Sequence, residues 1–394
     1  MNSKQRVLQV YSVPGKWYTL KYVFVVVLLA VRKFLAKYSQ KRVLSPGYGI
    51  QSCSNLEEMD KRIPLSSDPK AFDAVYFNGA NRIGWNIIIG CALRPKNVDG
   101  FLILKVPGVG LLLSPRLPDT VLFKKEEDLS CFSTDGLTLT PLKPMQLWHL
   151  QYNGKMRLSH KPHKKVKVEI DATWESNLPI FNYDTNVLTK NIAKAMSRES
   201  WSSQYFKLLK NFHQTHYEQF GELSGKVIID GVDFKLNMST MRDHSFGLRR
   251  EWRAFHRYML LMFTLADGTC GTVGIVCIPN LFSRMEIGYV YGKDKRLEAV
   301  YDVDFDLYNH GETGLPPTDF GLTFFAGGRL YEMKVHVEET TELFLGLTWE
   351  ARIVEGLCRF SINRVDGWGC VEWMYAHSDG RPFKQTSKHP LAAE

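Results

Sequence analysis

Residues 257–279 read RYMLLMFTLADGTCGTVGIVCIP, two apolar runs joined by Asp267-Gly268. Aromatic and β-branched residues favour strands, and Asp-Gly favours the tight turn of a β-hairpin. Similar runs follow at 285–292, 297–308, 322–339, 344–363 and 368–375, and a further hairpin with Asp230-Gly231 precedes them at 226–236. Short strands at regular spacing are typical of β-sandwiches and barrels. The sequence therefore predicts an all-β domain at 218–380.

The same pattern occurs in the first half of the chain. Strand-like runs stand at 72–79, 83–93, 101–106 and 109–113, and the runs 145–152 and 166–174 flank a basic turn. This part predicts a β domain at 65–185. No alternation of strands and helices is present, which argues against a Rossmann-type fold. We expect two antiparallel β-barrel or sandwich domains.

A helical pattern separates the two predicted domains. Apolar residues recur at helical spacing in 186–196 and 200–220, with Ser200 as a candidate N-cap. These runs predict a helical connection at 186–217. The remaining segments are a leader at 1–42, a polar linker at 43–64 and a tail at 381–394.

The net charge of +9 belongs to the leader alone. The first acidic residue is Glu57, and nine Lys and Arg residues precede it. The rest of the chain is formally neutral, which argues against a nucleic-acid partner.

The apolar core of the leader is short. Tyr22 to Val31 is an uninterrupted apolar run of ten residues, about 15 Å of helix against a hydrocarbon core of roughly 30 Å. It would form a transmembrane helix only if Lys21, Arg32 and Lys33 snorkel outward. We predict an N-terminal apolar helix that acts as a signal-anchor or interfacial helix at an intracellular membrane. The membrane we expect is that of the endoplasmic reticulum, with the protein facing the cytosol. A mitochondrial import signal and an ordinary helix packed on the body are the alternatives.

The sequence offers no familiar cofactor or metal motif. It has no GxGxxG opening a helix, no GxxxxGK[ST], no GxSxG and no CxxC. Its seven cysteines are irregularly spaced and read as buried, reduced thiols. His213 and His216 stand one turn apart in the predicted helix, but no second pair of ligands accompanies them. We therefore expect no cofactor and no metal.

Residues 241–252, MRDHSFGLRREW, hold six ionisable groups within ten residues. In an extended strand, Arg242 and His244 face one way and Asp243 and Ser245 the other. An Asp–His–Arg cluster can provide general acid or base chemistry, with Glu218 as a second acid. The alternative is a buried Arg–Asp pair that fixes a barrel corner.

The run RDHSFG followed by Trp252 resembles the signature of the tocopherol cyclase and carotenoid 1,2-hydratase superfamily. The nearest resemblance is to the N-terminal region of animal phosphoenolpyruvate synthase-like proteins, through DAVYFNGAN (73–81), PMQLWHLQYNGKMR (144–157), HYEQFGELSGKV (216–227) and GWGCVEW (367–373). The resemblance covers most of residues 70–376. It implies two lipocalin-like domains and an apolar ligand.

Two functional hypotheses follow. The first is a membrane-associated binding or transfer protein that holds a lipid or isoprenoid between the two domains. The residues expected to bind this ligand are Arg242, Arg249, Trp252, Trp373 and Glu372. Arg242 and His244 would contact the polar head group of the ligand. The sequence favours this hypothesis.

The second hypothesis is a cyclase, hydratase or isomerase of terpenoid or lipid metabolism. Asp243, His244 and Glu218 would be its catalytic residues, with Glu372 as the alternative to Glu218 beside Asp243, and Trp252 and Trp373 would stabilise a cationic intermediate. It ranks second because the neighbouring Arg242 is expected to lower the pKa of Asp243, which opposes a role as general acid.

Overall fold

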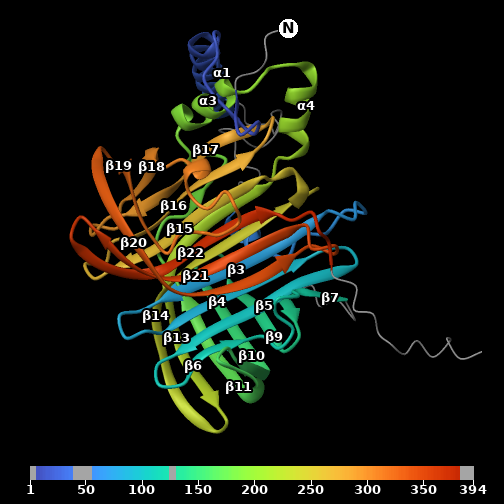
Figure 1. The fold of residues 1–394 in the computed structure, drawn as a ribbon, viewed down its shortest axis with the longest axis vertical. Coiled ribbons are helices and arrows are strands. Elements are labelled where there is room, and N and C mark those ends of the chain that lie inside the picture. Colours follow the sequence, from blue (N-terminus) through green and yellow to red (C-terminus); the bar gives the residue numbers. More distant parts are fainter. Residues whose placement is uncertain (1–5, 39–55, 124–129, 382–394) are drawn as a thin grey trace, which may run out of the picture.

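The computed structural model describes residues 6–38, 56–123 and 130–381. Most of these residues lie in antiparallel strands, which form a 12-stranded sheet and a closed eight-stranded barrel (Figure 1). The prediction of an all-β protein with two β bodies is confirmed.

The first body is the 12-stranded sheet. Its strand order is β11-β13-β14-β3-β4-β5-β6-β10-β9-β8, and an additional pairing of β10 with β11 brings the sheet round on itself. A core of large apolar side chains, including Phe77, Trp148 and Trp174, fills its interior. The strands are β3 (Phe72–Ala80), β4 (Asn86–Leu93), β5 (Asn97–Val106), β6 (Gly110–Leu113), β7 (Val121–Phe123), β8 (Phe132–Thr134), β9 (Leu137–Lys143), β10 (Leu147–Leu158), β11 (Lys161–Glu175), β12 (Phe181–Asn182), β13 (Thr215–Ile229) and β14 (Val232–Gly247).

The second body is the closed barrel. Its first two strands are the hairpin predicted at 257–279, and Gly268 in the turn has a φ of +83°, which favours glycine. The strands are β15 (Arg257–Leu265), β16 (Cys270–Ile278), β17 (Phe282–Tyr291), β18 (Leu297–Asp304), β19 (Asp319–Ala326), β20 (Arg329–Leu345), β21 (Ala351–Ile362) and β22 (Val365–Ala376). The short 3-10 helices η1 (Trp252–Ala254) and η2 (Leu307–Asn309) precede β15 and follow β18.

The predicted boundary between the domains differs from the structure. Strands β13 and β14 were assigned to the second domain, 218–380, but they pair with β11 and β3 of the first sheet. The barrel therefore begins at Arg257. The alternation of apolar and polar residues identifies a strand but not the strand with which it pairs. A hairpin next to a domain boundary can therefore join the sheet of either domain.

The helical connection is shorter than predicted. Helix α3 (Thr189–Arg198) and helix α4 (Ser203–Asn211) form, and the side chain of Ser202, rather than Ser200, caps α4 by accepting a hydrogen bond from the Tyr205 amide at 3.1 Å. The helix predicted to reach residue 220 ends at Asn211, and His216 lies in strand β13. Pairing with β14 overrides the helical spacing in this segment.

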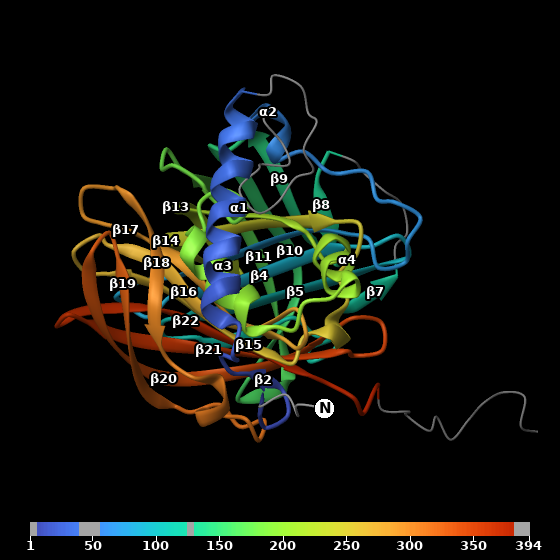
Figure 2. The same cartoon turned by 90° about the horizontal axis from the view of Figure 1, so that it is seen from above.

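The leader packs on the body. Strands β1 (Arg6–Val7) and β2 (Tyr11–Ser12) form a hairpin, and helix α1 (Tyr18–Tyr38) lies against α3 (Figure 2). The linker contributes the short helix α2 (Leu56–Met59); the rest of its predicted range up to residue 55 lies outside the described residues. None of the helices in the described ranges is long and apolar enough to cross a membrane, so the predicted transmembrane or signal-anchor helix finds no support.

The described cysteines are buried thiols, as predicted. These are Cys91, Cys131, Cys270, Cys277, Cys358 and Cys370. Burial raises the pKa of the Cys91 thiol to about 12, so it stays protonated and unreactive near neutral pH. Cys53 lies outside the described residues.

A fully buried ion pair ties the segment after α2 to the first sheet. Arg242 of β14 donates to Asp60 at 2.7 Å and to Gln219 at 2.9 Å, and neither Arg242 nor Asp60 has exposed surface. The indole of Trp148 also donates to Asp60, at 3.1 Å. The alternative of a buried Arg–Asp pair is thus correct in kind, but the partner is Asp60 rather than Asp243.

Removing one member of this pair should strongly destabilise the protein. We expect Asp60→Ala to lower the free energy of unfolding by about 3–5 kcal/mol, because it leaves the Arg242 guanidinium buried and uncompensated. Chemical denaturation measures the loss. Arg359→Ala is the matched control, since Arg359 pairs with Glu338 with 75% of its side chain exposed and should cost about 1 kcal/mol or less. Equal losses in the two variants would contradict the assignment.

Candidate functional site

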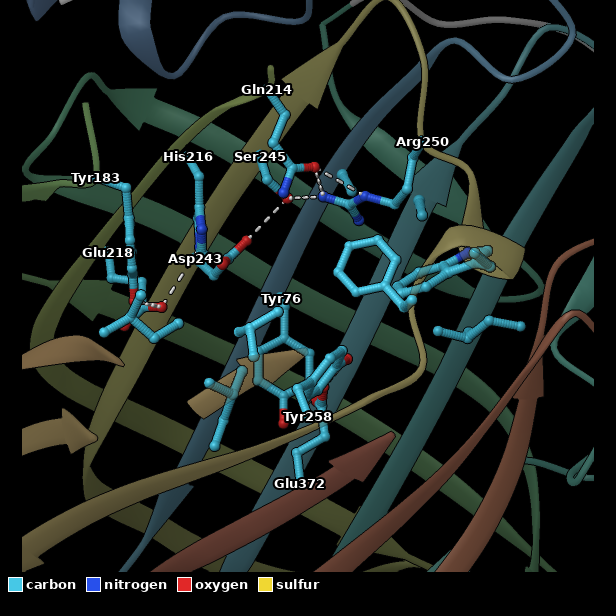
Figure 3. Close-up of a pocket in the computed structure, with 18 of the residues that line it drawn as sticks. Tyr76, Tyr183, Gln214, His216, Glu218, Asp243, Ser245, Arg250, Tyr258 and Glu372 are labelled. Carbon is cyan, nitrogen blue, oxygen red and sulfur yellow. Dashed lines mark hydrogen bonds and ion pairs between the residues drawn. The ribbon is translucent and has the colours of Figure 1, made fainter. Parts of the chain in front are cut away.

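A cavity of about 330 Å³ lies between the first sheet and the barrel (Figure 3). This volume is within the range of small-molecule sites. Most of its wall is apolar and includes Met241 of the first sheet, Trp252 of η1, and Met262 and Ile353 of the barrel. Two groups of ionisable side chains interrupt this apolar lining.

The first group, the histidine cluster, comprises Tyr183, His216, Glu218 and Asp243. His216 Nε2 forms an ion pair with Asp243 and lies 3.4 Å from Glu218 Oε1. The Tyr183 ring stacks on the imidazole with 4.0 Å between centroids, and its hydroxyl donates to Glu218 at 2.7 Å. Strand register explains the grouping, because Glu218 of β13 stands directly opposite Asp243 of β14.

The histidine cluster holds an ion pair at neutral pH. Burial alone would lower the pKa of His216, but the charges and hydrogen bonds of Asp243 and Glu218 outweigh it and raise this pKa to about 9. Burial would raise the pKa of Asp243, and the imidazolium outweighs it in turn, so that pKa is lowered. The cluster therefore presents an imidazolium beside a carboxylate.

The second group, the glutamate pair, comprises Glu355 and Glu372. They stand opposite each other on β21 and β22, and Glu355 is 1% exposed. Tyr258 donates to Glu372, and Tyr76 of β3 donates to Glu355 at 3.2 Å. Glu355 Oε2 is buried and has no hydrogen-bond donor among the described residues. A proton shared with Glu372 would supply that bond.

The glutamate pair retains a proton near neutral pH. Burial first, and then the charge of Glu372, hold the pKa of Glu355 well above its ordinary range, and burial raises the pKa of Glu372. Two carboxyls in contact cannot both ionise in a buried site. The pair therefore offers a neutral carboxylic acid to the cavity.

Arg250 provides a further positive charge at the cavity wall. Its guanidinium donates to Ser245 and to Gln214, both at 2.9 Å, and Ser245 in turn donates to Asp243 at 3.3 Å. Burial lowers the pKa of Arg250 to about 10, so it remains charged at neutral pH. Arg250 thus reinforces the ionised state of Asp243.

Four of the predicted site residues line the cavity: Asp243, Glu218, Glu372 and Trp252. The other four lie elsewhere. Arg242 and His244 are fully buried on the opposite face of β14, where His244 bonds to Tyr217 and Asp73. Trp373 packs inside the barrel, and Arg249 is half exposed, 3.9 Å from Asp68. The alternation predicted for 242–245 is correct, but the sequence did not show which face meets the cavity.

Sequence reasoning missed several residues of the site. His216 was considered only as a metal ligand, and Glu355, Tyr76, Tyr183, Tyr258 and Arg250 were not proposed. Arg250 stands within the charged motif and could have been found there. Nothing in the local sequence marks Glu355 as a site residue. Its role is apparent only when it is known to stand opposite Glu372 in the sheet.

The histidine cluster could also hold a metal ion. His216, Glu218 and Asp243 each offer one ligand atom, and these atoms lie within 4.8 Å of one another. One imidazole and two carboxylates suit a first-row divalent metal. Such an ion would replace the proton that His216 shares with Asp243, so metal and ion pair are mutually exclusive states of the cluster.

Comparison with known proteins identifies the family and the fold. A family model described as a family of unknown function, DUF8627, matches residues 1–375. No curated protein matches the chain. The structure is similar to a protein described as AttH from Nitrosomonas europaea (TM-score 0.50, 9% identity, covering 85% of this chain and 100% of that chain). It is also similar to kievitone hydratase from Nectria haematococca (TM-score 0.50, 11% identity, covering 85% and 98%).

These likenesses support the lipocalin-like β fold that the superfamily resemblance implied. At such low identity they show the fold alone. The predicted link to animal phosphoenolpyruvate synthase-like proteins finds no support in them.

The titration of His216 tests the histidine cluster. We expect its imidazole to titrate near pH 9 in the folded protein, so its contribution to stability is complete below the ordinary pKa of about 6.5 and is lost as the pH rises through about 9. Asp243→Asn should lower this pKa by at least about one unit, because burial then acts with less opposition. Histidine NMR measures it. Asp171→Asn, which removes the exposed partner of His149, should leave His216 unchanged.

Proposed function

The chain belongs to the family of unknown function DUF8627, and from the chemistry of its cavity we propose that it is an acid–base enzyme acting at a carbon–carbon double bond of an apolar substrate. The observation that carries this proposal is the pairing of a neutral carboxylic acid with a charged carboxylate cluster in one apolar cavity. The glutamate pair comes from the barrel and the histidine cluster from the first sheet, so a bound substrate would lie between them (Figure 3).

The reaction begins at the glutamate pair. Its proton moves to one alkene carbon, and the π electrons of the double bond form the new C–H bond. The adjacent carbon becomes cationic. The π-faces of Tyr76, Tyr258 and Trp252 on the cavity wall stabilise that charge. The glutamate pair has given up its shared proton, and the carbocation beside it offsets the second negative charge, which the empty site could not hold.

One proton then passes to a base, either from the cation itself or from a water molecule that has bonded to it. In a hydration, a water oxygen bonds to the cationic carbon and the water proton passes to the Asp243 or Glu218 carboxylate. In an isomerisation or a cyclisation, an adjacent C–H bond breaks and supplies that proton. One proton is donated and one is returned, and exchange with water restores both groups, so no oxidant or reductant is needed.

This assignment narrows the role predicted for Asp243. The sequence hypothesis had Asp243 supply or remove a proton, and the expected effect of Arg242 was an objection to the role as acid. The objection applies with a different cation, because His216 rather than Arg242 lowers the pKa of Asp243 most. Asp243 suits the base, and Glu372, predicted to bind the ligand or to supply or remove a proton beside Asp243, belongs to the acid.

An enzyme accounts for these features better than a carrier does. Two carboxyls buried in contact cost free energy, and an apolar ligand needs no such pair in order to bind. Kievitone hydratase shares the fold, so this fold can accommodate a hydratase site.

Deuterium incorporation tests the proposed reaction. Purified protein is incubated in D₂O with a panel of isoprenoid alkenes, and products are examined by mass spectrometry. We expect wild-type protein to introduce deuterium, and Glu372→Gln to reduce the rate by at least about 100-fold, because the amide cannot donate the acid proton. Glu342→Gln, an exposed carboxylate paired with Arg352, is the control and should retain the rate.

The binding function has a distinct outcome in the same experiment. If the protein retains an alkene through gel filtration but introduces no deuterium, it is a carrier. Undiminished exchange in Glu372→Gln would remove the glutamate pair from the mechanism.

A further inference from the structure

Helix α1 carries a broad apolar face that the body leaves exposed. Between Trp17 and Leu35, nine large hydrophobic side chains are at least 45% exposed, with Phe24 at 53% and Val27 at 55%. At about 100° per residue they fall on one continuous side of the helix, and no charged residue interrupts them. An exposed apolar face of this length marks a contact surface rather than ordinary scatter.

The opposite face of α1 is fastened to the body. Val25 and Leu29 are 1% and 4% exposed and belong to the same core as α3. Lys21 donates to the Glu199 carbonyl at 2.6 Å, and Lys33 donates to Thr189 Oγ1 at 3.3 Å. The helix therefore presents its apolar side outward in a fixed orientation, as Figure 2 shows for its position on the outer surface over α3.

We propose that α1 lies in the plane of an anionic membrane surface. Charge identifies this occupant, because nine Lys and Arg residues and no acidic residue precede Glu57, while the remaining chain is formally neutral. Basic segments beside an apolar helical face bind anionic lipid. A second copy of the chain would bring two basic leaders together, which opposes a pairing of α1 with itself.

The docked helix places the cavity beside the lipid. Ile192 of α3 lines the cavity and belongs to the same core as Val25 and Leu29. A substrate dissolved in the bilayer would then reach the cavity across α3. This supply of substrate rests on the proposed function, whereas the membrane contact does not.

Vesicle flotation of the full chain tests the contact. We expect the protein to float with vesicles that contain phosphatidylserine, and much less with phosphatidylcholine alone or at high salt. The double substitution Phe24→Glu and Val27→Glu should lower the bound fraction roughly tenfold, because charge on the apolar face opposes insertion. Leu315→Glu, which adds a charge at a residue that is 74% exposed and not part of α1, is the control and should float like wild type.

Three results would overturn the proposal. The first is equal flotation of the double variant and wild type, and the second is no flotation with either vesicle. The third is a wild-type dimer in light scattering that the double variant converts to a monomer, which would make the α1 face an interface between two copies of the chain. Deuterium exchange in detergent should be the same in wild type and the double variant, so a failure of membrane contact is distinguishable from a failure of the proposed reaction.

Discussion

The register of strand β14 is the constraint on which the site depends. Its side chains alternate between two environments that tolerate no exchange: Arg242 and His244 point into the first-sheet core, and Asp243 and Ser245 face the cavity. The Arg242–Asp60 ion pair fixes this register, because a shift by one residue would leave a buried guanidinium without its carboxylate and turn Asp243 into the core. A structural ion pair on one face thereby positions a chemical group on the other.

The sequence predicted the elements better than their partners. The apolar runs and the Asp-Gly turn at 267–268 located a barrel hairpin correctly, since both are local signals. The attachment of β13 and β14 to the first sheet depends on pairing with β3, far away in the chain, and no local pattern encodes it. The end of α4 was missed because residues 212–220 fit a helical spacing, and the pairing of β13 overrides it.

The same limit applies to the site. Asp243, Glu218, Glu372 and Trp252 could be named because a motif or a resemblance marked them. The glutamate pair could not be recognised, because Glu355 acquires its meaning from its register opposite Glu372 and from Tyr76, which another domain supplies. Burial then decides protonation: Asp243 is ionised beside an imidazolium, while Glu355 and Glu372 share a proton, although all three are carboxyls in one cavity.

Tyr76 joins the two halves of the molecule. It lies opposite Asp243 in the first sheet and donates its hydroxyl proton to Glu355 in the barrel. That hydrogen bond opposes the effect of burial and lowers the proton affinity of Glu355. Proton affinity and domain packing are thermodynamically linked at this site, because both the burial of Glu355 and its hydrogen bond from Tyr76 depend on how the two bodies meet, so a ligand that changes their fit also changes how tightly the carboxyl holds its proton. The acid strength of the cavity is therefore a property of the junction between the domains.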